Sequence, residues 1–86
     1  MPTVDITIQH AEGMHARPAS IFVREAARFK SEIRLSAGGT TVNGKSIMGL
    51  LMLALSAGTV VTLEAEGPDA DAACATLSEI LAGNFE

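Results

Sequence analysis

The feature that most constrains this chain is the alternation of apolar and polar side chains in short stretches. Within residues 61–66, Val61, Leu63 and Ala65 alternate with Thr and Glu, and residues 3–9 and 31–36 repeat the pattern. A β-branched stretch, 40–43, follows a Gly-Gly pair typical of a tight hairpin turn. Successive side chains of a strand point to opposite faces, so these stretches predict four strands in a sheet with one apolar face.

Helical spacing of apolar residues separates these strands. It predicts helices over residues 16–29, 47–53 and 70–81, with Ser46 and Asp69 as N-caps of the second and third. The predicted order is β-α-β-β-α-β-α, and the helices should cover the apolar face of the sheet. The expected fold is therefore a two-layer α+β structure, with residues 1–86 forming a single domain.

Composition excludes several classes of function. The net charge is −4 and the chain has no Trp or Tyr, so we expect no binding to nucleic acid. The longest apolar run, residues 47–55, is too short to cross a bilayer, and we expect neither membrane insertion nor a signal peptide. Cys74, the one cysteine, should be a small core residue. The two His and one Cys lack metal-ligand spacing, so we expect no metal and no cofactor. A single cysteine cannot form an internal disulfide, and together with the expected lack of a signal peptide this indicates a cytoplasmic location.

His15 occupies the position where a strand leads into a helix, within the stretch Gly13–Ala19. Pro18 suits a first helical turn, so His15 should adjoin a helix N-terminus. The unpaired backbone N–H groups there, at Ala16 and Arg17, and the Arg17 guanidinium would hold an anion. A nucleophilic ring nitrogen beside such a site suits a phosphoryl acceptor.

Other interpretations of His15 remain open at this stage. A lone His at a helix start is commonly a surface residue or a cap, and short motifs specify function loosely. A small His-dependent hydrolase is a further alternative, although no Ser-His or carboxylate-His constellation supports it. His10, at the end of the first strand, is expected to be a solvated loop residue.

A second group of residues is expected to form a docking surface. A helix of about seven residues cannot bury its whole circumference against one sheet, so part of its apolar surface should be exposed. Exposed Met also suits a surface that fits several partners. The predicted docking residues are Ile47, Met48 and Leu51 of the short helix, with Ala16, Ser20 and Arg24 of the first.

Two motifs together resemble a known family. The stretch from Gly13 to Ala19 is similar to the active-site segment of HPr, the histidine-containing phosphocarrier family of the bacterial sugar phosphotransferase system. The stretch Asn43-Gly44-Lys45-Ser46-Ile47-Met48-Gly49-Leu50 is similar to that family's regulatory-serine segment. The resemblance covers essentially the whole chain. It implies an open-faced β-sandwich with an antiparallel sheet in the order 1-4-2-3.

The resemblance also implies a function. His15 would accept a phosphoryl group, on Nδ1, from phosphorylated Enzyme I and pass it to the IIA domain of a sugar permease. The chain would thus be a monomeric carrier rather than a stand-alone enzyme. In many bacteria a kinase/phosphorylase also modifies the serine that matches Ser46, and a transcriptional regulator reads the result. Relatives that act only as regulators lack the histidine, which this chain keeps. Gly44, where some members have a bulkier residue, should loosen the loop before Ser46.

Overall fold

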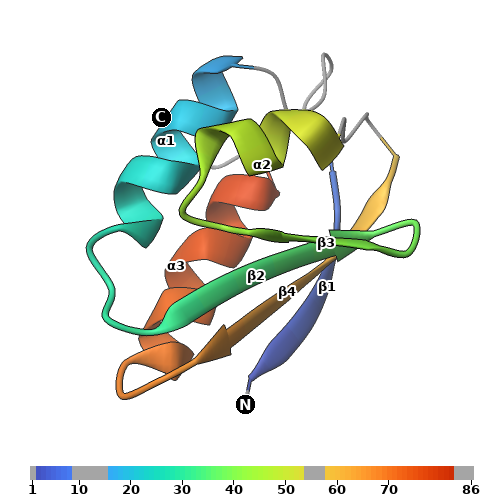
Figure 1. The fold of residues 1–86 in the computed structure, drawn as a ribbon. Helices are drawn as coiled ribbons and strands as arrows, with labels where there is room; N and C mark the ends of the chain where they lie inside the picture. Colours follow the sequence, from blue (N-terminus) through green and yellow to red (C-terminus); the bar gives the residue numbers. More distant parts are fainter. Residues whose placement is uncertain (1, 9–15, 54–57, 83–86) are drawn as a thin grey trace.

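The computed structural model describes residues 2–8, 16–53 and 58–82, without the side chains of residues 16–18 (Figure 1). Its strands are β1 (Thr3–Thr7), β2 (Glu32–Ala37), β3 (Thr40–Asn43) and β4 (Val60–Glu66). They form one antiparallel sheet in the order β1-β4-β2-β3. Three helices, α1 (Ala16–Ala26), α2 (Ile47–Leu53) and α3 (Ala70–Leu81), lie against one face of it. The predicted two-layer α+β fold and strand order are confirmed.

The apolar face of the sheet is built mainly by the two central strands. Val61, Leu63 and Ala65 of β4 are fully buried, as are Ile33 and Leu35 of β2. The register sets Leu35 opposite Leu63 and Ile33 opposite Ala65. The alternation in the sequence therefore predicted correctly which residues face the helices. The helices add Phe22, Leu50 and Leu77, and Phe22 is the largest of the fully buried side chains described.

The edge strand β1 departs from the prediction. Ile8, just past its end, is buried, but Ile6 is half-buried and Val4 is 37% exposed. In the sheet β1 has a neighbour on one side only, β4. Alternation identified the strand correctly but did not reveal that its first apolar residue lies at a poorly covered edge.

Helix α1 ends earlier than the sequence predicts. Its last residue is Ala26, whereas the apolar spacing predicted a helix as far as Phe29. Arg28 N donates to Glu25 O and Phe29 N to Ala26 O, both at 3.1 Å, which is the tighter i→i+3 pattern of a terminating helix. The next two backbone N–H groups, of Lys30 and Ser31, donate to the Asp69 carboxylate at 2.9 Å each. Bonds from outside the helix thus replace further helical bonds.

The two predicted N-caps behave differently. Ser46 caps α2 as expected, because its Oγ accepts from Gly49 N at 3.1 Å. Asp69 occupies the N-cap position of α3, as predicted, but its side chain makes no capping hydrogen bond there. Its carboxylate accepts from the Ser31 hydroxyl at 2.5 Å as well as from the backbone N–H groups of Lys30 and Ser31. These hydrogen bonds lower the pKa of Asp69, and the bond from the Ser31 hydroxyl has the largest effect.

A close approach of two turns makes this contact possible. Gly67 has a φ of +149°, and a Cβ added to it would lie 2.6 Å from Ser31 Cα. Ser31 is itself buried. The turn before α3 can therefore approach the α1–β2 turn only because residue 67 has no side chain.

Candidate functional site

The first predicted group of site residues surrounds the start of α1. The helix begins at Ala16, the residue that follows His15 in the chain. His15 itself and the side chains of Ala16 and Arg17 lie outside the described residues, so their predicted roles stay predictions. Ser20 and Arg24, four residues apart on α1, are both exposed, as a docking surface requires. Helix α1 packs against α2 (Figure 1).

The second predicted group lies on α2 and is exposed. Ile47, Met48 and Leu51 are 41%, 68% and 38% exposed, which confirms that this helix leaves apolar surface uncovered. Met52, at 76%, is the most exposed of the large apolar residues described, and the prediction missed it. Its position four residues after Met48 was the available signal, because i and i+4 share a helix face. We call Ile47, Met48, Leu51 and Met52 the α2 apolar patch.

Ser46 lies at the start of this patch and is half-buried. Its hydroxyl oxygen accepts from Gly49 N, so the hydroxyl proton is not used in that bond. The loop before it is firmly held, since Lys45 N donates to Asn43 Oδ1 at 2.9 Å and Lys45 Nζ to Phe29 O at 2.8 Å. The local structure therefore presents Ser46 on a fixed loop at the edge of the α2 apolar patch.

Gly44 does not loosen this loop, contrary to expectation. Its N–H donates to Ile33 O at 2.7 Å, and the residue is buried. A Cβ at this position would lie 2.5 Å from Ile33 Cγ2. In this chain the absence of a side chain lets the loop approach β2 closely, so glycine tightens the contact.

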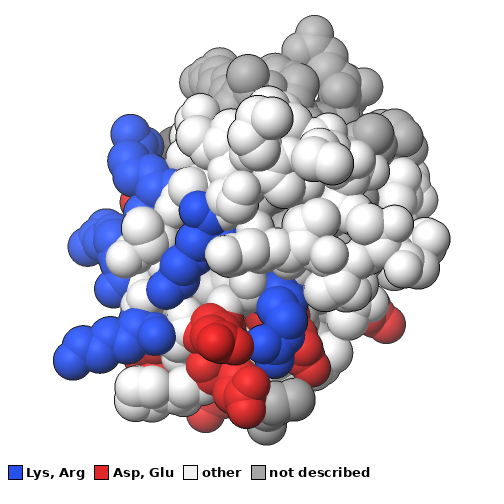
Figure 2. Space-filling view, in the orientation of Figure 1, with Lys and Arg blue, Asp and Glu red and all other residues white. Residues whose placement is uncertain are grey.

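Positive charge gathers beside the α2 apolar patch although the chain is acidic overall (Figure 2). Arg24, Arg28 and Lys30 are exposed on α1 and the turn that follows it, and Lys45 is half-buried. Arg28 pairs with Glu25 at 3.3 Å. Within the described residues, no carboxylate lies within ion-pair distance of Arg24, Lys30 or Lys45. Such a surface favours encounter with an acidic partner.

Negative charge gathers instead on the uncovered face of the sheet. Arg34 lies there among three carboxylates, with ion pairs to Glu64 at 2.7 Å, Glu32 at 2.8 Å and Glu66 at 3.2 Å. Hydrogen bonds to these carboxylates raise the pKa of Arg34, the bond to Glu64 most and the bond to Glu66 next. The cluster joins β2 and β4 across the polar face and lies on other elements than α1 and α2.

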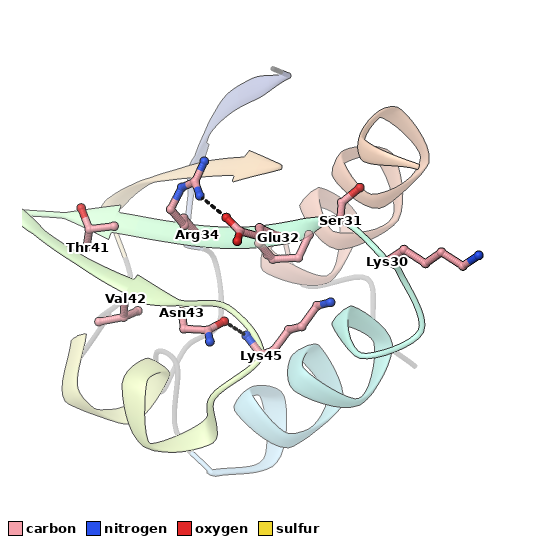
Figure 3. Close-up of a pocket in the computed structure, with 9 residues that line it drawn as sticks. Lys30, Ser31, Glu32, Arg34, Thr41, Val42, Asn43 and Lys45 are labelled. Carbon is pink, nitrogen blue, oxygen red and sulfur yellow. Dashed lines mark hydrogen bonds and ion pairs between the residues drawn. The ribbon is translucent and has the colours of Figure 1, made fainter. Parts of the chain in front are cut away.

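A shallow pocket of about 410 Å³ opens beside β2 and β3 (Figure 3). Several of its polar groups already have hydrogen-bond or ion-pair partners. Arg34 bonds to Glu32, Lys45 N bonds to Asn43, and Lys45 Nζ is bound to Phe29 O. The candidate site is therefore the exposed surface of α1 and α2 rather than this pocket.

Two other kinds of site, a metal site and a membrane-spanning helix, are absent from the described residues. No three His, Cys, Asp or Glu residues among those described are arranged to hold a metal ion. None of the described helices has the length and apolar character needed to span a membrane. Cys74 is buried, as predicted, and its thiol lies 3.6 Å from Pro2 O.

These features define a small open-faced α+β sandwich with an exposed apolar and basic surface. Residues 2–83 match the family model described as the phosphorylation site of the HPr component of the phosphotransferase system. The chain belongs to the HPr family of phosphocarrier proteins.

Similar proteins support this assignment. The phosphocarrier protein HPr of Neisseria meningitidis is 44% identical over 80 residues, covering 93% of this chain and 90% of the relative. The HPr-like protein Crh of Bacillus subtilis is 52% identical over 64 residues, covering 74% and 75%. The crystal structure of HPr-C-His from Thermoanaerobacter tengcongensis superposes with a TM-score of 0.93, 42% identity and coverage of 99% and 96%.

Proposed function

We propose that this phosphocarrier accepts a phosphoryl group on His15 from phosphorylated Enzyme I and passes it to IIA domains of sugar permeases in the cytoplasm. The observation that carries the proposal is the start of α1 at Ala16, directly after His15. Family membership over residues 2–83, a span that includes His15, supports it.

The chemistry follows from that position. A ring nitrogen of His15 attacks phosphorus, an N–P bond forms, and the bond between phosphorus and the donor breaks. Phosphoryl transfer needs positioning and charge stabilisation more than covalent machinery. The N–H groups of the first turn of α1, at Ala16 and Arg17, and the Arg17 guanidinium supply positive charge to the phosphoryl oxygens. Because a carrier must also release the phosphoryl group, we expect this site to be open rather than enclosed.

The α2 apolar patch and the exposed side of α1 are proposed to receive both partners in turn. Ile47, Met48 and Leu51 offer apolar contact area, and Arg24 and Ser20 offer polar contacts beside it. An acidic surface on Enzyme I or on a IIA domain would complement Arg24 and its basic neighbours. Exposed Met side chains adapt to surfaces of different shape, as successive partners require.

Ser46 is proposed as a regulatory phosphorylation site, used by a kinase/phosphorylase and read by a transcriptional regulator. A phosphate adds a charge of about −1.5 to −2. At Ser46 this charge adjoins Ile47 and Met48, so burying it against Enzyme I requires its desolvation. Inhibition would then be local and electrostatic, without a change in the fold.

The test is phosphorylation by Enzyme I and phosphoenolpyruvate. The wild type should acquire an acid-labile phosphoryl group, and His15→Ala should acquire none while keeping its thermal stability. His10→Ala is the matched control, because it removes the other histidine of the chain, and it should be labelled normally. Labelled His15→Ala would reject the assignment.

A purely regulatory function, acting through Ser46 alone, is the second candidate. The 52% identity to Crh is the observation that favours it. The same assay separates the two functions, because a purely regulatory protein would not be labelled by Enzyme I.

We also propose that the working form is a monomer. Crh of B. subtilis has been solved as a swapped dimer, so sedimentation of this chain at micromolar concentration decides its own state.

A further inference from the structure

We propose that Met48 and Met52 are a site of reversible oxidation, and that peroxide, by converting them to sulfoxides, blocks docking of the phosphoryl donor on α2. The inference rests on the proposed function, because the docking surface belongs to it. The reagent is a hydroperoxide such as hydrogen peroxide.

Exposure makes these two thioethers the reactive sulfurs of the described chain. Met48 and Met52 are 68% and 76% exposed, and they lie four residues apart on one face of α2. Cys74, the other sulfur in the described residues, is 7% exposed. Burial raises the pKa of the Cys74 thiol, which keeps it from forming the reactive thiolate. An oxidant in solution therefore meets the methionines before the cysteine.

The chemistry balances without a further reactant. A lone pair of the methionine sulfur attacks one peroxide oxygen, an S–O bond forms and the O–O bond breaks. The sulfur is oxidised by two electrons, and the other peroxide oxygen leaves as hydroxide, which takes up the released proton to give water. A thiol-dependent sulfoxide reductase reverses the change.

The structural consequence is confined to the surface. Leu50 is the fully buried residue of α2, and Leu53 is half-buried, so the helix stays attached to the core through residues that are not oxidised. A sulfoxide is polar, and a partner that covers it must strip it of water. Two sulfoxides among Ile47 and Leu51 therefore turn the α2 apolar patch into a polar one.

The experiment combines mapping with transfer kinetics. The protein is treated with hydrogen peroxide, and peptide masses identify which methionines gain oxygen. The rate of phosphorylation by Enzyme I is then measured before and after treatment. We expect oxygen on Met48 and Met52, an unchanged thermal melt, and a loss of about tenfold in transfer rate, the size of one strong interface contact. Sulfoxide reductase should restore the rate.

The matched control is the double variant Met48→Leu, Met52→Leu, which is apolar but has no sulfur at these positions. It keeps Met1 and Met14, so its treated-to-untreated ratio measures the effect of oxidation elsewhere. That ratio should stay near one, whatever the variant's starting rate. An equal loss in the variant and the wild type, or unaltered transfer by fully oxidised wild type, overturns the proposal. If untreated protein accepts no phosphoryl group, the proposed function fails, and this inference fails with it.

Discussion

Helices α2 and α3 are both rich in apolar residues, but they use them differently. Helix α3 buries Ala70, Ala73, Cys74, Leu77, Ile80 and Leu81 against the sheet and α1. Helix α2 buries Leu50 and leaves the α2 apolar patch exposed. Fully burying a large apolar side chain stabilises a fold by about 1.5–3 kcal/mol, so α3 contributes mainly to stability. The exposed area of α2 is available to a partner instead.

The N-cap residues of the two helices, Ser46 and Asp69, also differ in what they bind. Ser46 bonds within its own short helix, and Asp69 bonds to the distant α1–β2 turn. The Asp69 bonds join two turns that are far apart in the chain. The Ser46 bond stabilises a short helix whose outer face remains free. Substitutions on the two helices should therefore separate stability from binding.

The largest expected effect is on stability and comes from α3. Leu77→Ala removes a fully buried side chain and leaves a cavity, and it should lower the free energy of unfolding by about 2–5 kcal/mol. Denaturant unfolding measures this change. Met52→Ala on α2 should change stability by less than about 0.5 kcal/mol, because the side chain is largely exposed. Similar losses in the two variants would show that the outer face of α2 contributes to stability as much as the buried face of α3.

Asp69 should make the stability of the α3 attachment depend on pH. Its pKa is lowered in the folded state from an ordinary value of 3.8, so the bonds it accepts stabilise the protein above that value. The contribution is lost as pH falls through the folded pKa. Asp69→Asn should therefore lower the melting temperature near pH 7 and differ less from the wild type at pH 2–3. A constant difference at both pH values would contradict the role of the carboxylate.

Ser46→Asp should slow phosphorylation by Enzyme I by about tenfold, equivalent to 1.4 kcal/mol, with little change in the melt. The charge adjoins the α2 apolar patch, and Asp is itself a good N-cap. High ionic strength should relieve part of the loss, because exposed charges are screened. Kinetics equal to those of the wild type would rule out the proposed regulation through Ser46. A large fall in melting temperature would show that the charge damages α2.

Ser46→Ala should have a small effect, and on stability rather than on phosphoryl transfer, the reverse of Ser46→Asp. It removes the oxygen that accepts from Gly49 N, which lowers stability by about 1 kcal/mol or less. Phosphorylation of His15 should proceed at nearly the wild-type rate, since no charge is added. A transfer defect as large as that of Ser46→Asp would mean that the cap, rather than the charge, matters to docking.

The sequence was sufficient wherever burial follows a regular period. Alternation correctly placed Val61, Leu63 and Ala65 in the core, and helical spacing predicted the helix α3, which buries six residues. The exposure of Val4 was missed because it depends on the position of β1 at the sheet edge. The end of α1 was missed because the backbone N–H groups after it donate to the Asp69 carboxylate, more than thirty residues away in the chain. The spacing of apolar residues along the chain carries no information about such long-range contacts.

The candidate site was predictable to a different degree. The exposure of Ile47, Met48 and Leu51 followed from the limited surface that a short helix can bury. The close contact of Gly44 with Ile33 could not be foreseen, because it joins a loop to a strand eleven residues earlier. The positions of the side chains of His15 and Arg17 remain a prediction from motif and resemblance.

The most direct test of the carrier function is phosphorus NMR of the protein after phosphorylation by Enzyme I. We expect one phosphohistidine signal that disappears when a permease IIA domain is added and reappears on that domain. Peptide mapping should assign the signal to His15. A phosphate that is stable in acid, lies on another residue, or stays on the protein in the presence of the IIA domain would contradict the carrier function.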